Sequence, residues 1–206
     1  MPTNQGLVAA PGSVAVGSNP TQLFGKQADA LGSELHGKYY TAAYNGRLFT
    51  ASAAAVTIPV IAASLVSVFT LWNPPGSGIN MEIAEASVSP VAATTVVDAV
   101  GWYYSTAAQS AAGTFTTAGT VQSALVGGPV GQGKFFSAYT HNGTPVLVDV
   151  IGDFGAVTEA GSSGPTKLYD GKLILPPGIA MSIAMSIGAG FTAGLTAFAS
   201  WAEWPI

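Results

Sequence analysis

Short runs of apolar and β-branched residues, separated by Gly, Pro, Asn and Ser, recur along most of this chain. Residues 46–51 and 65–72 are the first two runs, and the second ends at the turn sequence Asn73-Pro-Pro-Gly. Short runs with such sharp boundaries are typical of β-strands. The pattern therefore predicts a succession of strands from residue 46 onward.

Helical periods do not alternate with these runs, and the chain has no strong internal repeat, so a βαβ architecture is not favoured. We expect an all-β fold, specifically a jelly-roll-like two-sheet sandwich with an extended N-terminal arm. The further expected strands are residues 81–88, 95–104, 121–126, 134–139, 146–151, 172–175, 180–187 and 195–204.

Residues 1–45 are rich in Gly, Pro, Ser and Asn and show no sustained hydrophobic period, although residues 28–35 are compatible with a short helix. This segment has little of its own to bury, so we expect an arm that is either mobile or ordered against a neighbouring subunit. Residues 46–206 then form the β-sandwich domain.

Charged residues make up only 8% of the chain, against roughly a quarter in an ordinary soluble domain, whereas the hydrophobic fraction of 49% is typical. So few charges predict a surface that is covered by copies of the same chain or by a larger assembly. The net charge of −4 and the scattered basic residues argue against nucleic acid as a partner. The absence of cysteine excludes disulfides and thiolate metal sites.

Residues 51–72 and 173–202 carry no charge over lengths that suit a membrane-spanning helix. Pro59 interrupts the first segment and Pro176-Pro177-Gly178 the second, and both are rich in residues that favour strands. We therefore expect no membrane span, and the first residues lack the features of a secretion signal.

The sequence Gly128-Pro-Val-Gly-Gln-Gly133-Lys134 has the glycine and lysine spacing of a phosphate-binding loop. Phe135 stands where a hydroxyl would hold magnesium, Pro129 removes a main-chain donor, and the following residues favour a strand. A flexible turn before a strand is the better interpretation, and no nucleotide cofactor is expected.

The two histidines, His36 and His141, are far apart and neither lies in a spacing that places two imidazoles on one metal. His141 is expected to be exposed in a turn, and the following Asn142-Gly143 pair favours a hairpin.

Glu82 and Glu85 are expected on opposite faces of a strand. Asp149 and Asp153 would share a face if their strand continued, but we expect Gly152 to break it and both carboxylates to lie on a solvated loop rim. No catalytic, cofactor-binding or metal-binding residue is assigned, and we do not expect an enzyme. Trp102, Tyr103 and Tyr104 suit core packing better than carbohydrate stacking.

Several short stretches, taken together and in order, are similar to small virion structural proteins of tailed bacteriophages, of the capsid cement or decoration type. The resemblance covers most of the chain from residue 34. It is carried by Glu34-Leu-His-Gly-Lys-Tyr-Tyr40, Tyr44-Asn-Gly-Arg-Leu-Phe49, Phe69-Thr-Leu-Trp-Asn-Pro74, Gly76-Ser-Gly78, Leu173-Ile-Leu-Pro-Pro-Gly178 and Trp201-Ala-Glu-Trp-Pro205.

This resemblance implies a non-enzymatic, trimeric jelly-roll subunit on the outer surface of the capsid, made in the host cytoplasm. The implied partner is the major capsid protein, and the implied role is to bridge neighbouring capsomers. Two alternatives stay open: a head-fibre or tail component, and a host-recognition module that binds glycan through an exposed aromatic such as Trp102 or Trp204.

Overall fold

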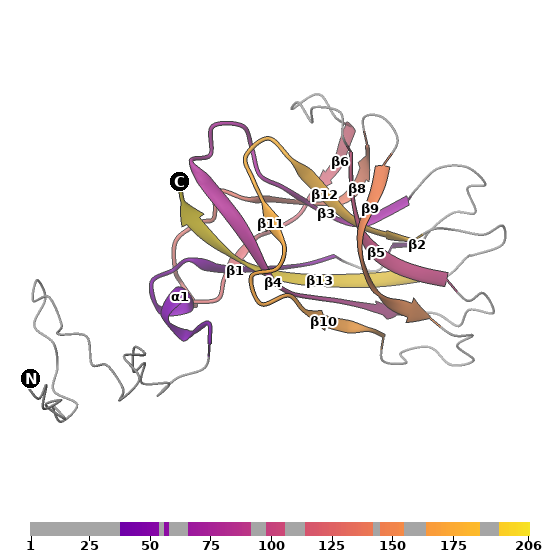
Figure 1. Ribbon diagram of the computed structural model, residues 1–206, viewed down its shortest axis with the longest axis horizontal. Coiled ribbons are helices and arrows are strands. Elements are labelled where there is room, and N and C mark those ends of the chain that lie inside the picture. The colour runs from indigo at the N-terminus through magenta and orange to yellow at the C-terminus, as the bar shows by residue number, and fades with distance from the viewer. Residues whose placement is uncertain are drawn as a thin grey trace, which may run out of the picture. The chain divides into compact units, whose positions relative to one another are not determined.

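The computed structural model divides the chain into two units, Met1–Tyr40 and Thr41–Ile206 (Figure 1). The structure describes residues 38–53, 56–57, 66–91, 98–105, 114–141, 145–154, 164–185 and 194–206. Most of the expected arm, including the helix expected at residues 28–35, lies outside these described residues.

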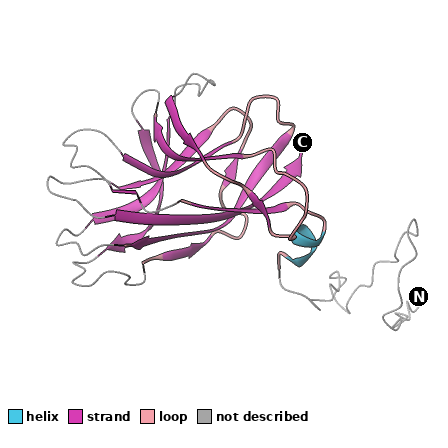
Figure 2. Cartoon of the chain, turned by 180° about the vertical axis from the view of Figure 1, so that it is seen from behind, coloured by secondary structure: helices cyan, strands magenta, loops and turns pink. Residues whose placement is uncertain are grey.

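Strands dominate the described residues, as Figure 2 shows, and the one helix among them is α1, Tyr40–Tyr44. No helix in this part of the chain is long and apolar enough to cross a bilayer. The strands are β1 Leu48–Ser52, β2 Val56–Thr57, β3 Val66–Trp72, β4 Ile79–Pro90, β5 Asp98–Ser105, β6 Thr114–Ala118, β7 Gln122–Ser123, β8 Lys134–Thr140, β9 Pro145–Phe154, β10 Thr166–Leu168, β11 Ile174–Leu175, β12 Ala180–Met185 and β13 Gly194–Pro205.

The strand pairing is that of a jelly roll. Four strands of the first half pair antiparallel, in reverse order, with four of the second half: β1 with β13, β3 with β12, β4 with β10, and β5 with β9. Pairing of β13 with β4 and of β12 with β5 then rolls this long hairpin into two sheets. The indigo β1 and the yellow β13 lie side by side in Figure 1. The predicted jelly-roll-like two-sheet sandwich is therefore confirmed.

An insertion between β5 and β9 extends both sheets on the same side of the roll. In one sheet β8 pairs with β3 and β6 pairs with β8, while in the other β7 pairs with β1. The sheet orders are β10-β4-β13-β1-β7, with β11 on β4 and β2 on β13, and β6-β8-β3-β12-β5-β9. Among the described strands, β9 and β10 lie at the opposite side of the roll and end their sheets.

Large aromatic side chains from both sheets fill the core. Trp102 on β5 and Trp201 on β13 are fully buried. The Phe69 ring meets Trp102 edge-on at 6.2 Å between centroids, and it lies 4.5 Å from the Phe135 ring. Such contacts add to the burial of apolar area. The prediction that Trp102 packs in the core is confirmed.

A β-bulge in β4 corrects one prediction about the carboxylates. Glu85 pairs with Ser200 on β13, but Ile83 already pairs with the next residue, Trp201, so Ala84 is an extra residue in β4. The bulge reverses the alternation of side chains along the strand. Consequently Ile83 and Ala84 are both buried and Glu82 and Glu85 are both partly exposed. The expectation that the two glutamates face opposite sides is wrong.

Candidate assembly surfaces

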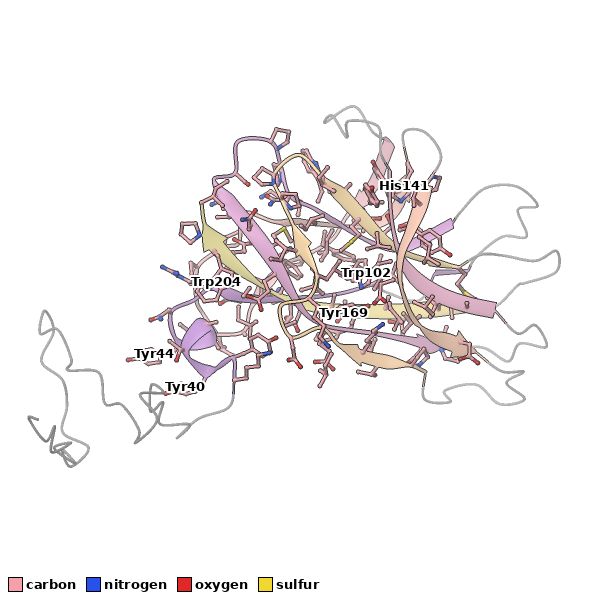
Figure 3. All side chains as sticks on the ribbon, viewed as in Figure 1. Tyr40, Tyr44, Trp102, His141, Tyr169 and Trp204 are labelled. Carbon is pink, nitrogen blue, oxygen red and sulfur yellow. The ribbon has the colours of Figure 1, made fainter. Side chains whose placement is uncertain are left out.

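Exposed apolar side chains gather at the end of the sandwich where β1 begins and β13 ends. The side chain of Val126 is 97% exposed and that of Val130 81% exposed, both in the segment that joins β7 to β8. We call this group the end surface; its members are Tyr44, Leu125, Val126, Val130, Trp204 and Ile206. Figure 3 labels Tyr44 and Trp204 at this same end. Apolar residues exposed together mark interaction sites in soluble proteins.

The loop that carries the two valines is tied to the sandwich by main-chain contacts. Ala124 N donates to the Leu48 carbonyl at 2.8 Å, and Gly128 N donates to the Leu125 carbonyl at 2.7 Å. A Cβ at Gly46 would lie 2.6 Å from Pro129 Cδ, so the loop packs closely against the residues before β1. Val126 is therefore exposed on a hydrogen-bonded turn, and Val130 follows that turn in the same loop, next to Pro129.

The side chain of Glu203 binds the main chain at the end of this loop. Its carboxylate accepts hydrogen bonds from Gln132 N and Gly133 N, both at 2.9 Å, and from Trp201 Nε1 at 3.2 Å. Glu203 is only 7% exposed, and a buried carboxylate needs such donors. Two main-chain donors of the sequence that resembles a phosphate-binding loop are thus occupied by a carboxylate of the chain itself.

Two contacts hold the side chain of Trp204 on the end surface. Its Nε1 donates to Glu82 Oε2 at 2.8 Å, and the Arg47 guanidinium lies 5.5 Å from the ring centroid. The indole is nevertheless 37% exposed. A hydrogen bond and a cation–π contact together fix the ring without burying it.

A second group of exposed apolar side chains follows the sheet edges β9 and β10. We call it the β9–β10 edge, and its members are Val146, Leu147, Val148, Val150 and Leu168. The four residues on β9 are each 42–45% exposed. Consecutive residues of a strand point to opposite faces, so exposure of neighbours on both faces is the property of a strand at an open edge.

The main chain of this edge is partly blocked. Two register shifts against β5 leave Val148 and Ile151 as extra residues in β9. Lys167 on β10 donates from Nζ to the Val150 carbonyl at 2.7 Å, and Pro165 lies 2.5 Å from where a Cβ of Gly152 would be. Bulges and an edge lysine are devices that oppose strand addition.

A polar cluster joins the two sheets behind this edge. Asp149 on β9 makes an ion pair with Lys167 Nζ, with N–O distances of 2.7 and 2.9 Å. The Tyr169 hydroxyl has no partner at standard hydrogen-bond geometry among the described residues, and its polar neighbours are Asp149 and the Trp102 indole. Burial, reinforced by the nearby Asp149 carboxylate, raises the pKa of Tyr169 above its usual range. Figure 3 labels Trp102 and Tyr169 within the sandwich.

The strand break expected at Gly152 is absent, since β9 runs through this glycine to Phe154. Both carboxylates remain accessible to solvent, because Asp153 is exposed and the side chain of Asp149, although paired with Lys167, is 34% exposed. β9 pairs with β5 on both sides of Gly152, and this pairing keeps β9 extended through the glycine.

The predicted exposure of His141 is also wrong. Both ring nitrogens are buried and have no hydrogen-bond partner within the described ranges, and the ring packs edge-on against Tyr139 at 4.8 Å. Burial lowers the pKa of His141 to about 4 and raises that of Tyr139 to about 12. His36 and the expected hairpin at residues 142–144 lie outside the described residues.

A chain of three buried hydroxyls connects β3 and β12. Thr70 Oγ1 lies 2.6 Å from Ser67 Oγ and 2.7 Å from Ser182 Oγ, and all three side chains are at most 2% exposed. Buried hydroxyls are stable when they satisfy one another in this way. Thr70 is the central hydroxyl, so replacing it would remove the hydrogen-bond partner of both serines.

Within the residues that the structure describes, no three histidine or acidic side chains are grouped as ligands for a metal ion. A scan against protein-family models, a search of curated proteins and a search of solved structures each found no match. The end surface and the β9–β10 edge are the features of the described residues that point to a role.

Proposed function

We propose that this chain is a non-enzymatic structural subunit of a tailed-bacteriophage virion, of the capsid cement or decoration type. In this role it sits on the outer surface of the capsid, bridges neighbouring capsomers and has the major capsid protein as its partner. The observation that carries the proposal is the end surface, where Val126 is exposed on a turn closed by a main-chain hydrogen bond and Val130 is exposed between that turn and the residues that Glu203 binds.

The mechanism is burial of apolar area against the shell. Complete burial of a valine side chain contributes about 1.5–3 kcal/mol, so several such residues can exceed the entropic cost of docking. Because the two valines are already held in place, little further ordering is needed when they dock. A cement subunit of this kind stabilises the shell mechanically and needs no reactive group.

The resemblance of the sequence to cement proteins and the scarcity of charge support the same proposal. Charged groups are costly to desolvate in an interface, and this chain has an 8% charged fraction. Assembly as a trimer, synthesis in the host cytoplasm and absence of a nucleic-acid or membrane partner belong to the proposal.

The test is to add the purified protein to capsids that lack it and to measure cosedimentation and the temperature at which the capsids release DNA. The wild-type chain is expected to bind and to raise that temperature. The double variant Val126→Glu/Val130→Glu is expected to lose both effects, since each carboxylate would be buried against the shell.

Val91→Glu/Ile174→Glu is the matched control, because it places the same two charges at exposed apolar residues outside both assembly surfaces. Binding by the wild type that persists in the Val126/Val130 variant would remove the end surface from the proposal. Failure of the folded wild-type chain to bind capsids would contradict the cement function itself.

Trp204 favours a second candidate, a head-fibre or tail module that binds host glycan. An exposed indole flanked by Arg47 and Glu82 offers a stacking surface and hydrogen-bonding groups to a sugar ring. Trp102 does not serve this role, because it is fully buried. Glycan-array binding that disappears in a folded Trp204→Ala variant would favour this candidate, and no binding to any glycan would remove it.

A further inference from the structure

We propose that Arg47, held against Trp204 on the end surface, recognises a carboxylate of the partner on which this surface docks. This assignment rests on the proposed function and names the chemistry of the partner, which is an acidic protein side chain bordered by apolar residues. One of its two tests uses the purified chain without capsids, so the assignment and the cement function can fail separately.

The main chain at Arg47 is fixed beside the exposed valines. Its carbonyl accepts a hydrogen bond from Glu203 N at 2.9 Å. Gly46, directly before it, lies so close to the loop between β7 and β8 that a Cβ there would be 2.6 Å from Pro129 Cδ. Because Val130 follows Pro129, the cation and an exposed valine lie on two segments that pack against each other.

Two contacts in series hold the exposed guanidinium of Arg47. Its Cζ lies 5.5 Å from the centroid of the Trp204 ring, and the Trp204 Nε1 donates to Glu82 Oε2 at 2.8 Å. A cation–π contact does not use the guanidinium N–H groups as donors to an oxygen. Arg47 is therefore preorganised with its donors available, which lowers the entropic cost of binding an anion.

The carboxylates at this end of the sandwich have other partners. That of Glu82 accepts from Trp204, and that of Glu203 is buried and accepts from the main chain of Gln132 and Gly133. In the described part of the chain Lys167 forms an ion pair with Asp149, whereas Arg47 forms none. The guanidinium is thus open to an anion from another molecule.

Docking of the end surface would take Arg47 out of water together with its apolar neighbours. A desolvated guanidinium without an anion is costly, whereas a carboxylate accepts two parallel N–H bonds from it. Arginine and tryptophan are also enriched at the residues that dominate binding energy in interfaces. The surface that fits therefore places an Asp or Glu side chain opposite Arg47 and apolar side chains opposite the valines.

The neighbours of Arg47 favour a protein carboxylate over the carboxylate of an acidic sugar. The exposed aliphatic side chains of the end surface, which suit apolar side chains of a protein, are Leu125, Val126, Val130 and Ile206. The hydroxyls of a sugar would instead lose water against these aliphatic groups without gaining hydrogen bonds.

The first test follows the side-chain Nε–H signal of Arg47 by NMR in the isotope-labelled full chain. Arg47 is the only arginine in the sequence, so this signal is single and identifies itself. The probe is the acetylated and amidated tripeptide Val-Glu-Val at millimolar concentration, with Val-Gln-Val as the neutral control and glucuronate as the acidic sugar. Only Val-Glu-Val is expected to shift the signal strongly, and Trp204→Ala is expected to reduce that shift.

The second test measures cosedimentation with capsids at low and high salt. Arg47→Met is expected to weaken binding about tenfold at low salt and to reduce its salt dependence, since a charge-assisted pair is lost. Lys134→Met is the matched control, because it removes one exposed positive charge outside the end surface and should bind like the wild type. Circular dichroism and thermal melting check that each variant is folded.

Three results would overturn the assignment: no shift with Val-Glu-Val, a larger shift with glucuronate than with Val-Glu-Val, or equal capsid binding by wild type and folded Arg47→Met. A chain that shifts with Val-Glu-Val but does not bind capsids would contradict the cement function and leave carboxylate recognition by Arg47 standing.

Discussion

Glu203 Oε1 lies 2.9 Å from the main-chain nitrogen of Gly133, a residue that precedes it by 70 positions. This hydrogen bond joins the central strand β13 to the loop that presents Val126 and Val130. The contact is close: a Cβ at Gly133 would lie 2.7 Å from Met81 Cε and 3.1 Å from Glu203 Oε1. A side chain at position 133 would therefore displace the end of the Met81 side chain, and the presentation of the end surface depends on the Glu203 carboxylate.

Replacing this carboxylate should weaken the fold. Glu203→Gln keeps one acceptor but turns an NH₂ group toward donors, so we expect a loss of about 1–3 kcal/mol in the free energy of unfolding. Urea denaturation measures it. Glu85→Gln, at a partly exposed position of β4, is the comparison and should change stability by less than about 0.5 kcal/mol. Equal effects of the two substitutions would show that the hydrogen bonds to Glu203 are unimportant.

Breaking the ion pair between Lys167 and Asp149 should have a small effect. The two side chains are 36% and 34% exposed, so solvent screens their attraction and the pair contributes up to about 1 kcal/mol. A double-mutant cycle with Lys167→Met and Asp149→Asn, measured by urea denaturation at low and high salt, isolates this coupling. A coupling energy that does not fall with salt would contradict the screened, edge position of the pair.

Acid should destabilise the protein through His141. Its pKa is about 4 in the folded chain and near the ordinary 6.5 when unfolded, so between these values the unfolded chain binds more protons. The contribution is fully present above pH 6.5 and is lost as the pH falls toward 4. His141→Gln should flatten this part of the stability curve relative to wild type. A steeper or unchanged curve, or the same flattening in His36→Gln, would refute the assignment.

The three-hydroxyl chain should respond unequally to single and combined substitutions. Thr70→Val removes the central member and leaves the Ser67 and Ser182 hydroxyls buried without it, which should cost about 1–2 kcal/mol. Ser67→Ala/Thr70→Val/Ser182→Ala removes all the polar groups and should cost less than Thr70→Val alone. Thermal melting of the two variants decides the order, and a less stable triple variant would rule out this account.

Most long strands could be predicted from the sequence because turn residues bound them sharply. Residues 65–72 and 134–139 were expected as strands, and β3 Val66–Trp72 and β8 Lys134–Thr140 match them closely. The prediction fails for β10 Thr166–Leu168, which was not expected, and for residues 121–126, where only Gln122–Ser123 pair. Such short strands exist because a neighbouring strand offers them hydrogen bonds, which depends on tertiary structure.

The sequence predicts that part of the surface is covered by other polypeptides, but it does not locate the candidate surfaces. The small number of charges indicates that surface is covered, but it does not say which residues are exposed. The bulge at Ala84 has no signal in the local sequence, since alternation there is equally consistent with a regular strand. The neighbours of His141 favour a turn and so predict an exposed ring, whereas the ring packs against Tyr139 and its two nitrogens are buried.

The position of β13 has a consequence for synthesis on the ribosome. This strand follows all the other described strands in the chain, yet it lies between β1 and β4 and pairs with both. A nascent chain that has emerged only through β12 has no central strand for one sheet. The sandwich therefore cannot close until residues 194–205 have also left the ribosome, so the earlier strands wait for a late partner.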